Sequence, residues 1–173
     1  MIYTGNWNRD AIDYQALLGQ WHVVCPSLDV GSEQPKAARL LGNDLVLWRD
    51  DTGQVHAWQD YCGHRGARLS LGHIKKGEIE CPYHGWRYNP EGQCTRVPAH
   101  PEQSGPASQR LVYRHLAQER YGYIWVSLKT PQRPLPEFPQ WDDVRYRKVY
   151  AGPYCYEANA LRSVENFIDA SHF

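Results

Sequence analysis

The 173-residue sequence lacks several features that would assign it quickly to a class of protein. It has no charge imbalance, because 19 Lys and Arg stand against 19 Asp and Glu, and this argues against a nucleic-acid-binding surface. No apolar run approaches the roughly 18 residues of a membrane-spanning helix. The first ten residues show no basic stretch followed by an apolar run. We therefore expect a cytoplasmic protein with no membrane or nucleic-acid partner.

A disulfide framework is also not expected. The five cysteines are an odd number, and without an export signal they favour metal ligation over disulfide pairing. A helical bundle is not expected either, because 14 Gly and 12 Pro suit a loop-rich β protein better.

The pattern of apolar residues predicts a mainly β, antiparallel fold with a short helix toward each end. A helix is expected over 10–19, and another from Leu161 toward Phe173. The predicted strands occupy 21–27, 45–48, 55–60, 79–81, 86–88, two stretches within 110–128, and one or two stretches within 145–159.

Four prolines between residues 130 and 141 predict a stiff linker, because proline does not fit the interior of a sheet. The expected organisation has four parts. It comprises an N-terminal helical segment at 1–19, a β domain at 20–129, the Pro-rich linker at 130–141, and the opening strand and helix of a second, α+β domain at 142–173. The β domain contains a small subdomain at about 60–90.

Two pairs of metal-ligating side chains stand inside that subdomain. Cys62 with His64 and Cys81 with His84 form two mixed pairs in glycine-flanked loops, separated by 16 residues. Structural zinc sites more often space their ligands as C-x2–4-C and H-x3–5-H. A mixed pair in each loop suits a two-iron cluster, because each loop then provides a thiolate ligand to one iron and an imidazole ligand to the other. Zinc, and cysteines that bind nothing, remain the alternatives.

The charge of such a cluster gives a reason for mixed ligation. Two ferric ions, two sulfides and two thiolates sum to zero, and neutral imidazoles add nothing. An electron enters a neutral centre more readily than the dianionic centre that four cysteines would make, so the potential rises.

The segments CGHRG at 62–66 and CPYHGW at 81–86 resemble the Rieske motif of the ring-hydroxylating oxygenases, in their terminal, α-subunit form. The short N-terminal run before WHVVCPS is similar to the vanillate demethylase and pheophorbide oxygenase members. The resemblance implies a Rieske [2Fe-2S] domain at 20–129. The extra cysteines of respiratory Rieske proteins are missing, and Trp86 stands where those proteins carry a serine donor. We therefore expect a potential on the order of −150 mV, at the low end of the Rieske range.

The segment ENFIDASHF at 165–173 resembles a second motif of the same family, with Asn166, Asp169 and His172 in register. The resemblance implies that His172 is a ligand of a mononuclear Fe(II) and that Asp169 links to His84 of a neighbouring subunit as a catalytic residue. A second His and a carboxylate of that iron site do not occur before Phe173. The sequence is therefore expected to be the N-terminal part of the catalytic chain, with an incomplete iron site. A solvent-facing amphipathic helix is the plainer alternative.

The family resemblance implies an oxidoreductase. An NAD(P)H-dependent reductase or a ferredoxin would reduce the cluster, and the cluster would pass electrons to Fe(II). That iron would activate O2 to hydroxylate or demethylate a small organic, aromatic substrate, in a homotrimer. The alternative is a Rieske ferredoxin-type electron-transfer protein without its own catalytic iron, which would need only residues 20–130.

Overall fold

The computed structural model describes residues 14–101, 111–149, 154, 157–158 and 160–169. The chain divides into two compact units, Met1–Pro136 and Glu137–Phe173, each considered by itself below. This division falls inside the predicted linker, while the four predicted domain ranges stay predictions. Antiparallel strands are the main regular structure of the first unit, which confirms the predicted mainly β fold.

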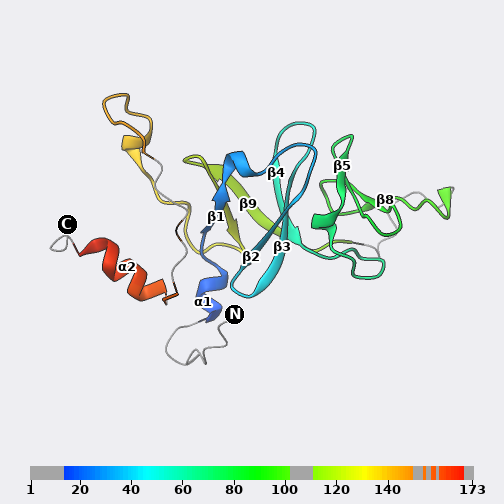
Figure 1. Cartoon of the computed structure of the whole chain (residues 1–173), viewed down its shortest axis with the longest axis horizontal. Coiled ribbons are helices and arrows are strands. Elements are labelled where there is room, and N and C mark those ends of the chain that lie inside the picture. The colour runs from blue at the N-terminus through cyan, green and yellow to red at the C-terminus, as the bar shows by residue number, and fades with distance from the viewer. Residues whose placement is uncertain (1–13, 102–110, 150–153, 155–156, 159, 170–173) are drawn as a thin grey trace. The chain divides into compact units, whose positions relative to one another are not determined.

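The larger sheet has six antiparallel strands in the order β1-β10-β9-β4-β3-β2 (Figure 1). Their bounds are β1 His22–Pro26, β2 Lys36–Leu40, β3 Asn43–Arg49, β4 Val55–Gln59, β9 Arg114–Arg120 and β10 Tyr123–Ser127. Strands β2, β3 and β4 pair in succession, because short turns join them. Strand β4 then pairs with β9 at Ala57–His115 and Trp58–Arg114. The predicted strands at 21–27, 45–48 and 55–60 are confirmed.

Strand β3 is buried on both faces, and this links the sheet to the rest of the unit. Leu45, Val46, Leu47 and Trp48 have no exposed surface. Successive side chains of a strand point to opposite faces. Leu45 and Leu47 accordingly pack into one hydrophobic cluster, and Val46 and Trp48 into another. The second cluster also contains both predicted ligand cysteines. Val46 and Trp48 of β3 therefore belong to the core that supports the candidate site.

A smaller sheet carries one of the two predicted ligand loops. It has four antiparallel strands in the order β5-β6-β7-β8. Their bounds are β5 His73–Lys75, β6 Glu78–Glu80, β7 Arg87–Tyr88 and β8 Cys94–Arg96. Ile79 and Tyr88 are fully buried and directly paired across β6 and β7. They face the same hydrophobic cluster as Trp48, so the two sheets share one core.

The turn between β3 and β4 is closed by one buried carboxylate. Asp50 Oδ1 accepts hydrogen bonds from the Thr52 N–H at 2.9 Å, the Thr52 hydroxyl at 2.6 Å and the Gln54 N–H at 3.0 Å. His56 Nε2 donates to Asp50 Oδ2 at 2.8 Å. Burial alone would raise the pKa of Asp50, but these donors outweigh it, and the pKa of the carboxyl lies below its usual range.

The second unit contains a 3-10 helix, Pro139–Trp141, and the helix α2, Ala160–Ile168. Helix α2 confirms the described part of the helix predicted from Leu161. The strands predicted within 145–159 are wrong for the residues that the structure describes there, 145–149, 154 and 157–158. Val149 is 75% exposed and Tyr146 56% exposed. Their apolar character therefore reflects surface positions and not a buried strand.

The described part of the predicted N-terminal helix is helical. Helix α1 spans Tyr14–Leu18, and residues 10–13 of the predicted helix lie outside the described residues. The end of α1 is tied to the residues that follow β10, since the Lys129 N–H donates to the Leu18 carbonyl at 2.9 Å. Among the described residues, no helix is long and apolar enough to span a membrane.

Candidate metal centre

The two predicted ligand loops have the same backbone architecture. In the first, the Cys62 N–H donates to the Ala67 carbonyl and the Gly66 N–H donates to the Cys62 carbonyl, both at 2.8 Å. In the second loop, the Cys81 N–H donates to the carbonyl five residues on, at 2.8 Å, and the N–H four residues on donates back to the Cys81 carbonyl, at 3.1 Å. Each loop is therefore a closed turn that begins at its cysteine.

A glycine with positive φ ends each turn. Gly66 has φ +70° and Gly85 has φ +67°, a conformation that L-residues with a Cβ rarely adopt. A Cβ on Gly85 would lie 3.2 Å from Pro98 Cγ, whereas a Cβ on Gly66 would have no neighbour within 4 Å. The second loop is thus packed more tightly at its glycine than the first.

Backbone N–H groups point at both cysteine sulfurs. Those of His64 and Arg65 reach the Cys62 sulfur, and those of Tyr83 and His84 reach the Cys81 sulfur. The donors are thus the second and third residues after each cysteine. Donors in this arrangement stabilise a thiolate, which is the form that binds metal.

The two thiols lie within hydrogen-bond distance of each other. The hydrogen bond from the Cys81 thiol lowers the pKa of Cys62 to about 6, against the effect of its burial. The same bond raises the pKa of Cys81, because the Cys81 thiol keeps its own proton to donate it to the Cys62 sulfur, and burial raises it further. Both cysteines are buried, with 1% and 2% of their surface exposed. Two buried sulfurs side by side form a natural site for one thiophilic metal ion.

The two imidazoles also come together. The ring centroids of His64 and His84 lie 4.7 Å apart. His64 stacks on the buried Trp86 at 4.2 Å with an interplanar angle of 5°, while His84 is exposed and lies against the exposed Tyr83 at 3.8 Å. His64 is therefore partly buried against Trp86, and His84 is exposed at the surface.

The arrangement pairs like donors across the two loops, thiol with thiol and ring with ring. A two-iron cluster with two thiolates on one iron and two imidazoles on the other requires this pairing. Within the part of the chain that the structure describes, no three His, Cys, Asp or Glu side chains gather as ligands of a single ion. The residues present fit the two-iron group.

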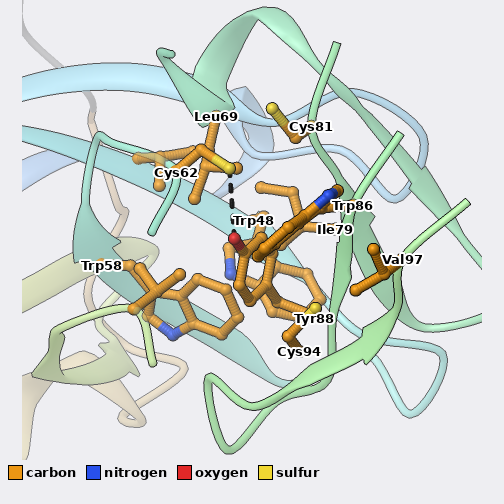
Figure 2. Packing of buried hydrophobic residues seen from close by; sticks show 12 residues of the cluster. Trp48, Trp58, Cys62, Leu69, Ile79, Cys81, Trp86, Tyr88, Cys94 and Val97 are labelled. Atoms are coloured by element: carbon orange, nitrogen blue, oxygen red, sulfur yellow. Dashed lines mark hydrogen bonds between the residues drawn. The ribbon is translucent and has the colours of Figure 1, made fainter. Parts of the chain in front are cut away.

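Tyr88 is a residue of this site that the sequence analysis missed. Its hydroxyl lies 3.1 Å from the Cys62 sulfur, and the side chain has no exposed surface (Figure 2). Burial first, and then the contact with Cys62, raises the pKa of Tyr88, so the hydroxyl keeps its proton and donates it to the sulfur. Tyr88 stands two residues after Trp86, directly beyond the second loop, but nothing in that position indicates a contact with Cys62, 26 residues away.

A carboxylate outside the ligand set holds the first loop in place. Asp60 accepts from the Ser70 N–H at 2.8 Å and from the Ser70 hydroxyl at 2.6 Å, and only 6% of Asp60 is exposed. These two bonds join the start of the loop segment to the 3-10 helix Leu69–Leu71 behind it. The loop is therefore fixed at both ends before any metal binds.

The two other cysteines that the structure describes, Cys25 and Cys94, are core residues. Cys94 is buried in the same cluster, and its thiol lies 3.5 Å from the Arg96 carbonyl (Figure 2). Cys25 lies in the other cluster, where burial raises its pKa. Cys155 lies outside the described residues. For Cys25 and Cys94, burial agrees with a role as small core residues.

The second predicted site is described only in part. Asp169 follows the last residue of α2, is half-buried, and donates its N–H to the Glu165 carbonyl at 3.1 Å. Asn166 is exposed on α2, and His172 lies outside the described residues. Asp169 and His84 belong to different units. The assignments of Asp169 and His172 therefore stay predictions.

Comparison with known proteins identifies the fold of the first unit. Residues 20–121 match the family model of the Rieske [2Fe-2S] domain. The chain is 39% identical over 160 residues to methylxanthine N1-demethylase NdmA of Pseudomonas putida, covering 88% of this chain and 45% of the relative. It is 34% identical over 142 residues to the 3-chlorobenzoate-3,4-dioxygenase oxygenase subunit of Comamonas testosteroni, covering 80% and 32%.

A solved structure of Pseudomonas putida CBB5 NdmA superimposes with a TM-score of 0.84 at 37% identity, over 93% of this chain and 50% of that chain. The chain therefore spans about half the length, or less, of the relatives that it matches.

Proposed function

The chain belongs to the Rieske [2Fe-2S] domain family, and from that premise we propose that the two thiols and two imidazoles of its loops are the ligands of the cluster. These ligands are Cys62, His64, Cys81 and His84. The observation that supports this most is the pairing of like donors across the two loops. When bound, the cluster supplies the ability to accept and release one electron.

The protein's own residues set how that electron is held. The backbone N–H groups of the two turns point at the cysteine sulfurs, and the Tyr88 hydroxyl adds a further donor to Cys62. Hydrogen bonds to sulfur stabilise the more negative, reduced state. Burial of both cysteines keeps water from the thiolate side. The exposed edge of His84 is then the closest approach for an electron partner.

We extend the proposal to the whole protein as the oxygenase component of a Rieske non-haem iron oxygenase. A reductase or ferredoxin supplies electrons through the Rieske domain to a mononuclear Fe(II), which activates O2 to hydroxylate or demethylate a small organic substrate. Its support is the similarity to a demethylase and to a dioxygenase subunit, together with the motif at Asn166, Asp169 and His172. We further propose that the intact protein is a cytoplasmic homotrimer.

The cluster is tested on the purified chain. We expect a red-brown protein with two iron ions and two acid-labile sulfides per chain, and the rhombic electron paramagnetic resonance spectrum of a Rieske centre after reduction. A colourless protein that contains one zinc ion would contradict the proposal.

The oxygenase role is tested separately in the full-length protein. Asp169→Ala and His172→Ala are expected to abolish substrate-dependent O2 consumption while the cluster remains reducible. Unchanged O2 consumption in both variants would contradict the roles proposed for these residues.

A further inference from the structure

The two ligand loops must be held at a fixed separation, because one cluster would take a thiolate and an imidazole from each. No disulfide does this within the described part of the chain, since its four cysteines are all free. A site of this kind needs supporting contacts that hold its ligands to within roughly 0.5 Å. The structure shows a continuous set of such contacts behind the two loops.

The first contact joins the residues before Cys62 to the residues that follow the first loop. Asp60 accepts from the Ser70 N–H at 2.8 Å and from the Ser70 hydroxyl at 2.6 Å. Ser70 is the middle residue of the 3-10 helix Leu69–Leu71. Leu69 is fully buried in the hydrophobic cluster that contains both ligand thiols (Figure 2). The 3-10 helix is therefore fixed by a carboxylate on one side and by the core on the other.

Gly72 connects this 3-10 helix to the second loop. Its N–H donates to the Leu69 carbonyl at 2.9 Å, and β5 begins at the next residue, His73, which lies opposite Glu80 of β6. A Cβ on Gly72 would lie 2.1 Å from the Glu80 carbonyl oxygen, well inside the usual C···O contact of about 3.3–3.6 Å. Only glycine lets the two backbones approach this closely. Glu80 immediately precedes Cys81, so the contact reaches the start of the second loop.

The side chain of Glu80 joins the two ends of the second loop. Glu80 and Arg87 are directly paired across β6 and β7, and residues 81–86 between them form the loop. Glu80 Oε2 accepts from Arg87 Nε at 2.6 Å, and the two side chains are only 13% and 19% exposed. Lys75 Nζ donates to the other carboxylate oxygen at 2.5 Å. These bonds have a charge on both partners, which makes them stronger than bonds between neutral groups.

We propose that these contacts act together as one bracket that fixes the spacing of the two ligand loops. The bracket consists of five positioning residues, which are Asp60, Ser70, Gly72, Glu80 and Arg87. The inference rests on the proposed function, because a fixed spacing matters only where one cluster takes ligands from both loops. The contacts follow one another in series, so opening the bracket at any point frees the two loops to move apart.

A bracket in series has a signature that two independent anchors lack. Breaking one contact of the bracket should loosen both loops, so breaking a second contact should add little. Independent anchors behave differently, because changes at separate sites with no shared partner usually add in free energy. A double-mutant cycle across the bracket therefore distinguishes the two arrangements.

The test measures the rate at which iron leaves the purified, cluster-loaded chain in an excess of an iron chelator. Ser70→Ala removes a hydrogen bond of the first contact, and Arg87→Ala removes the ion pair that joins the ends of the second loop. Each is expected to speed release by about tenfold, since each lost bond involves a carboxylate. The double variant should match the single variants, whereas independent anchors would give about a hundredfold. Ser70→Thr keeps the hydroxyl and should keep the wild-type rate.

Gly72→Ala tests the middle of the bracket, and Gly31→Ala is its matched control. The added methyl group must push Gly72 and Glu80 apart by roughly 1 Å, which moves the second loop relative to the first. The reduced cluster should then show shifted g values in its paramagnetic resonance spectrum and a shifted reduction potential. A Cβ on Gly31 would have no neighbour within 4 Å, and its φ is not positive, so Gly31→Ala should change neither. A purely structural role of Gly72 would lower stability and leave the spectrum of the loaded chain unchanged.

The outcomes separate the two levels of the proposal. A wild-type chain without a reducible two-iron cluster would contradict the proposed function. A normal cluster with additive effects of Ser70→Ala and Arg87→Ala would contradict the bracket alone. Wild-type g values and potential in a loaded Gly72→Ala chain would also contradict it. If that variant fails to fold, the cycle of Ser70 and Arg87 variants still decides, because neither change adds atoms to the core.

Discussion

The two ligand loops are built on the same turn but present their side chains in opposite ways. Both close through a bond from the cysteine N–H to the carbonyl five residues on. The histidine, however, is the second residue after the cysteine in the first loop and the third in the second. One step along a tight turn changes the direction of a side chain. His64 therefore stacks on the buried Trp86, while His84 reaches the surface.

This difference shows how one backbone motif, used twice, supplies two functions. The first loop is anchored from within, by Trp86 against its imidazole and by Tyr88 against its thiol. The second loop is packed at its glycine and exposes its imidazole and Tyr83. The first loop is therefore suited to setting the reduction potential of the cluster, and the second loop is suited to exchanging electrons with a partner. Four changes test this division, beginning with the largest expected effect.

Removing a thiol from either loop should abolish the cluster. We expect Cys62→Ala and Cys81→Ala each to purify without iron and without visible absorbance, because one iron would lose half of its protein ligands. Cys94→Ala is the matched control, since Cys94 is buried in the same cluster but outside the loops. Iron analysis and absorbance spectra distinguish the variants. A cluster retained in Cys62→Ala would remove that residue from the ligand set.

Adding a methyl group to each closing glycine should destabilise the second loop more than the first. Positive φ costs an L-residue roughly 1–2 kcal/mol, and both glycines have it. Gly85→Ala also places its Cβ against Pro98, so it should lose about 1 kcal/mol more than Gly66→Ala. Urea unfolding of the two variants, loaded in the same way, gives the difference. An equal loss would show that the loops are packed alike.

Removing the Tyr88 hydroxyl should shift the potential without loss of the cluster. Tyr88→Phe deletes the hydroxyl that lies 3.1 Å from the Cys62 sulfur and donates to it. A hydrogen bond to a charged sulfur that strengthens by about 1 kcal/mol on reduction corresponds to a decrease of about 40 mV when it is lost. Redox titration followed by paramagnetic resonance measures the shift. An unchanged potential would mean that the anchoring of the first loop is structural only.

The turn at Asp50 provides a reference that has no ligand role. Asp50→Asn should destabilise the chain by about 1–3 kcal/mol at pH 7, because it weakens the acceptor of four hydrogen bonds. The cluster spectrum should not change. The folded-state pKa of Asp50 is lowered, so its stabilisation is present above the unfolded pKa of about 3.9 and is lost as pH falls through the folded value.

The wild type and Asp50→Asn should therefore converge in stability below about pH 4. Unfolding curves across that pH range test the sign. A difference that persists in acid would assign the effect to the amide and not to the lost charge.

The sequence was informative where spacing or apolar runs carry the information. The mixed Cys and His pairs predicted four side chains that the structure brings together, thiol beside thiol and ring beside ring. The run at 45–48 predicted a strand that is buried on both faces. The pairing of thiol with thiol and ring with ring was also expected from ligand chemistry. These features are local in the sequence, or they follow from which ligands each iron of the cluster takes. No knowledge of the tertiary structure was therefore needed.

Other features depended on contacts between distant segments. The contact between Tyr88 and Cys62 joins residues 26 positions apart, and no spacing rule indicates it. Strand β8 has three residues, too few for a recognisable period. The apolar residues within 145–149 resembled a strand, but the described residues show no partner strand for them. A strand exists only where another backbone pairs with it, and that is a tertiary property.

The hydrophobic cluster that the two sheets share has a consequence for tryptophan fluorescence. Trp48, Trp58 and Trp86 pack in the same hydrophobic cluster as both ligand thiols (Figure 2). Indole emission overlaps the broad absorption of an iron–sulfur centre, so a bound cluster would quench these three fluorophores by energy transfer. The chain therefore carries an internal reporter. Loading, loss and oxidative damage of the metal centre could be followed in real time by ultraviolet fluorescence, with no added dye.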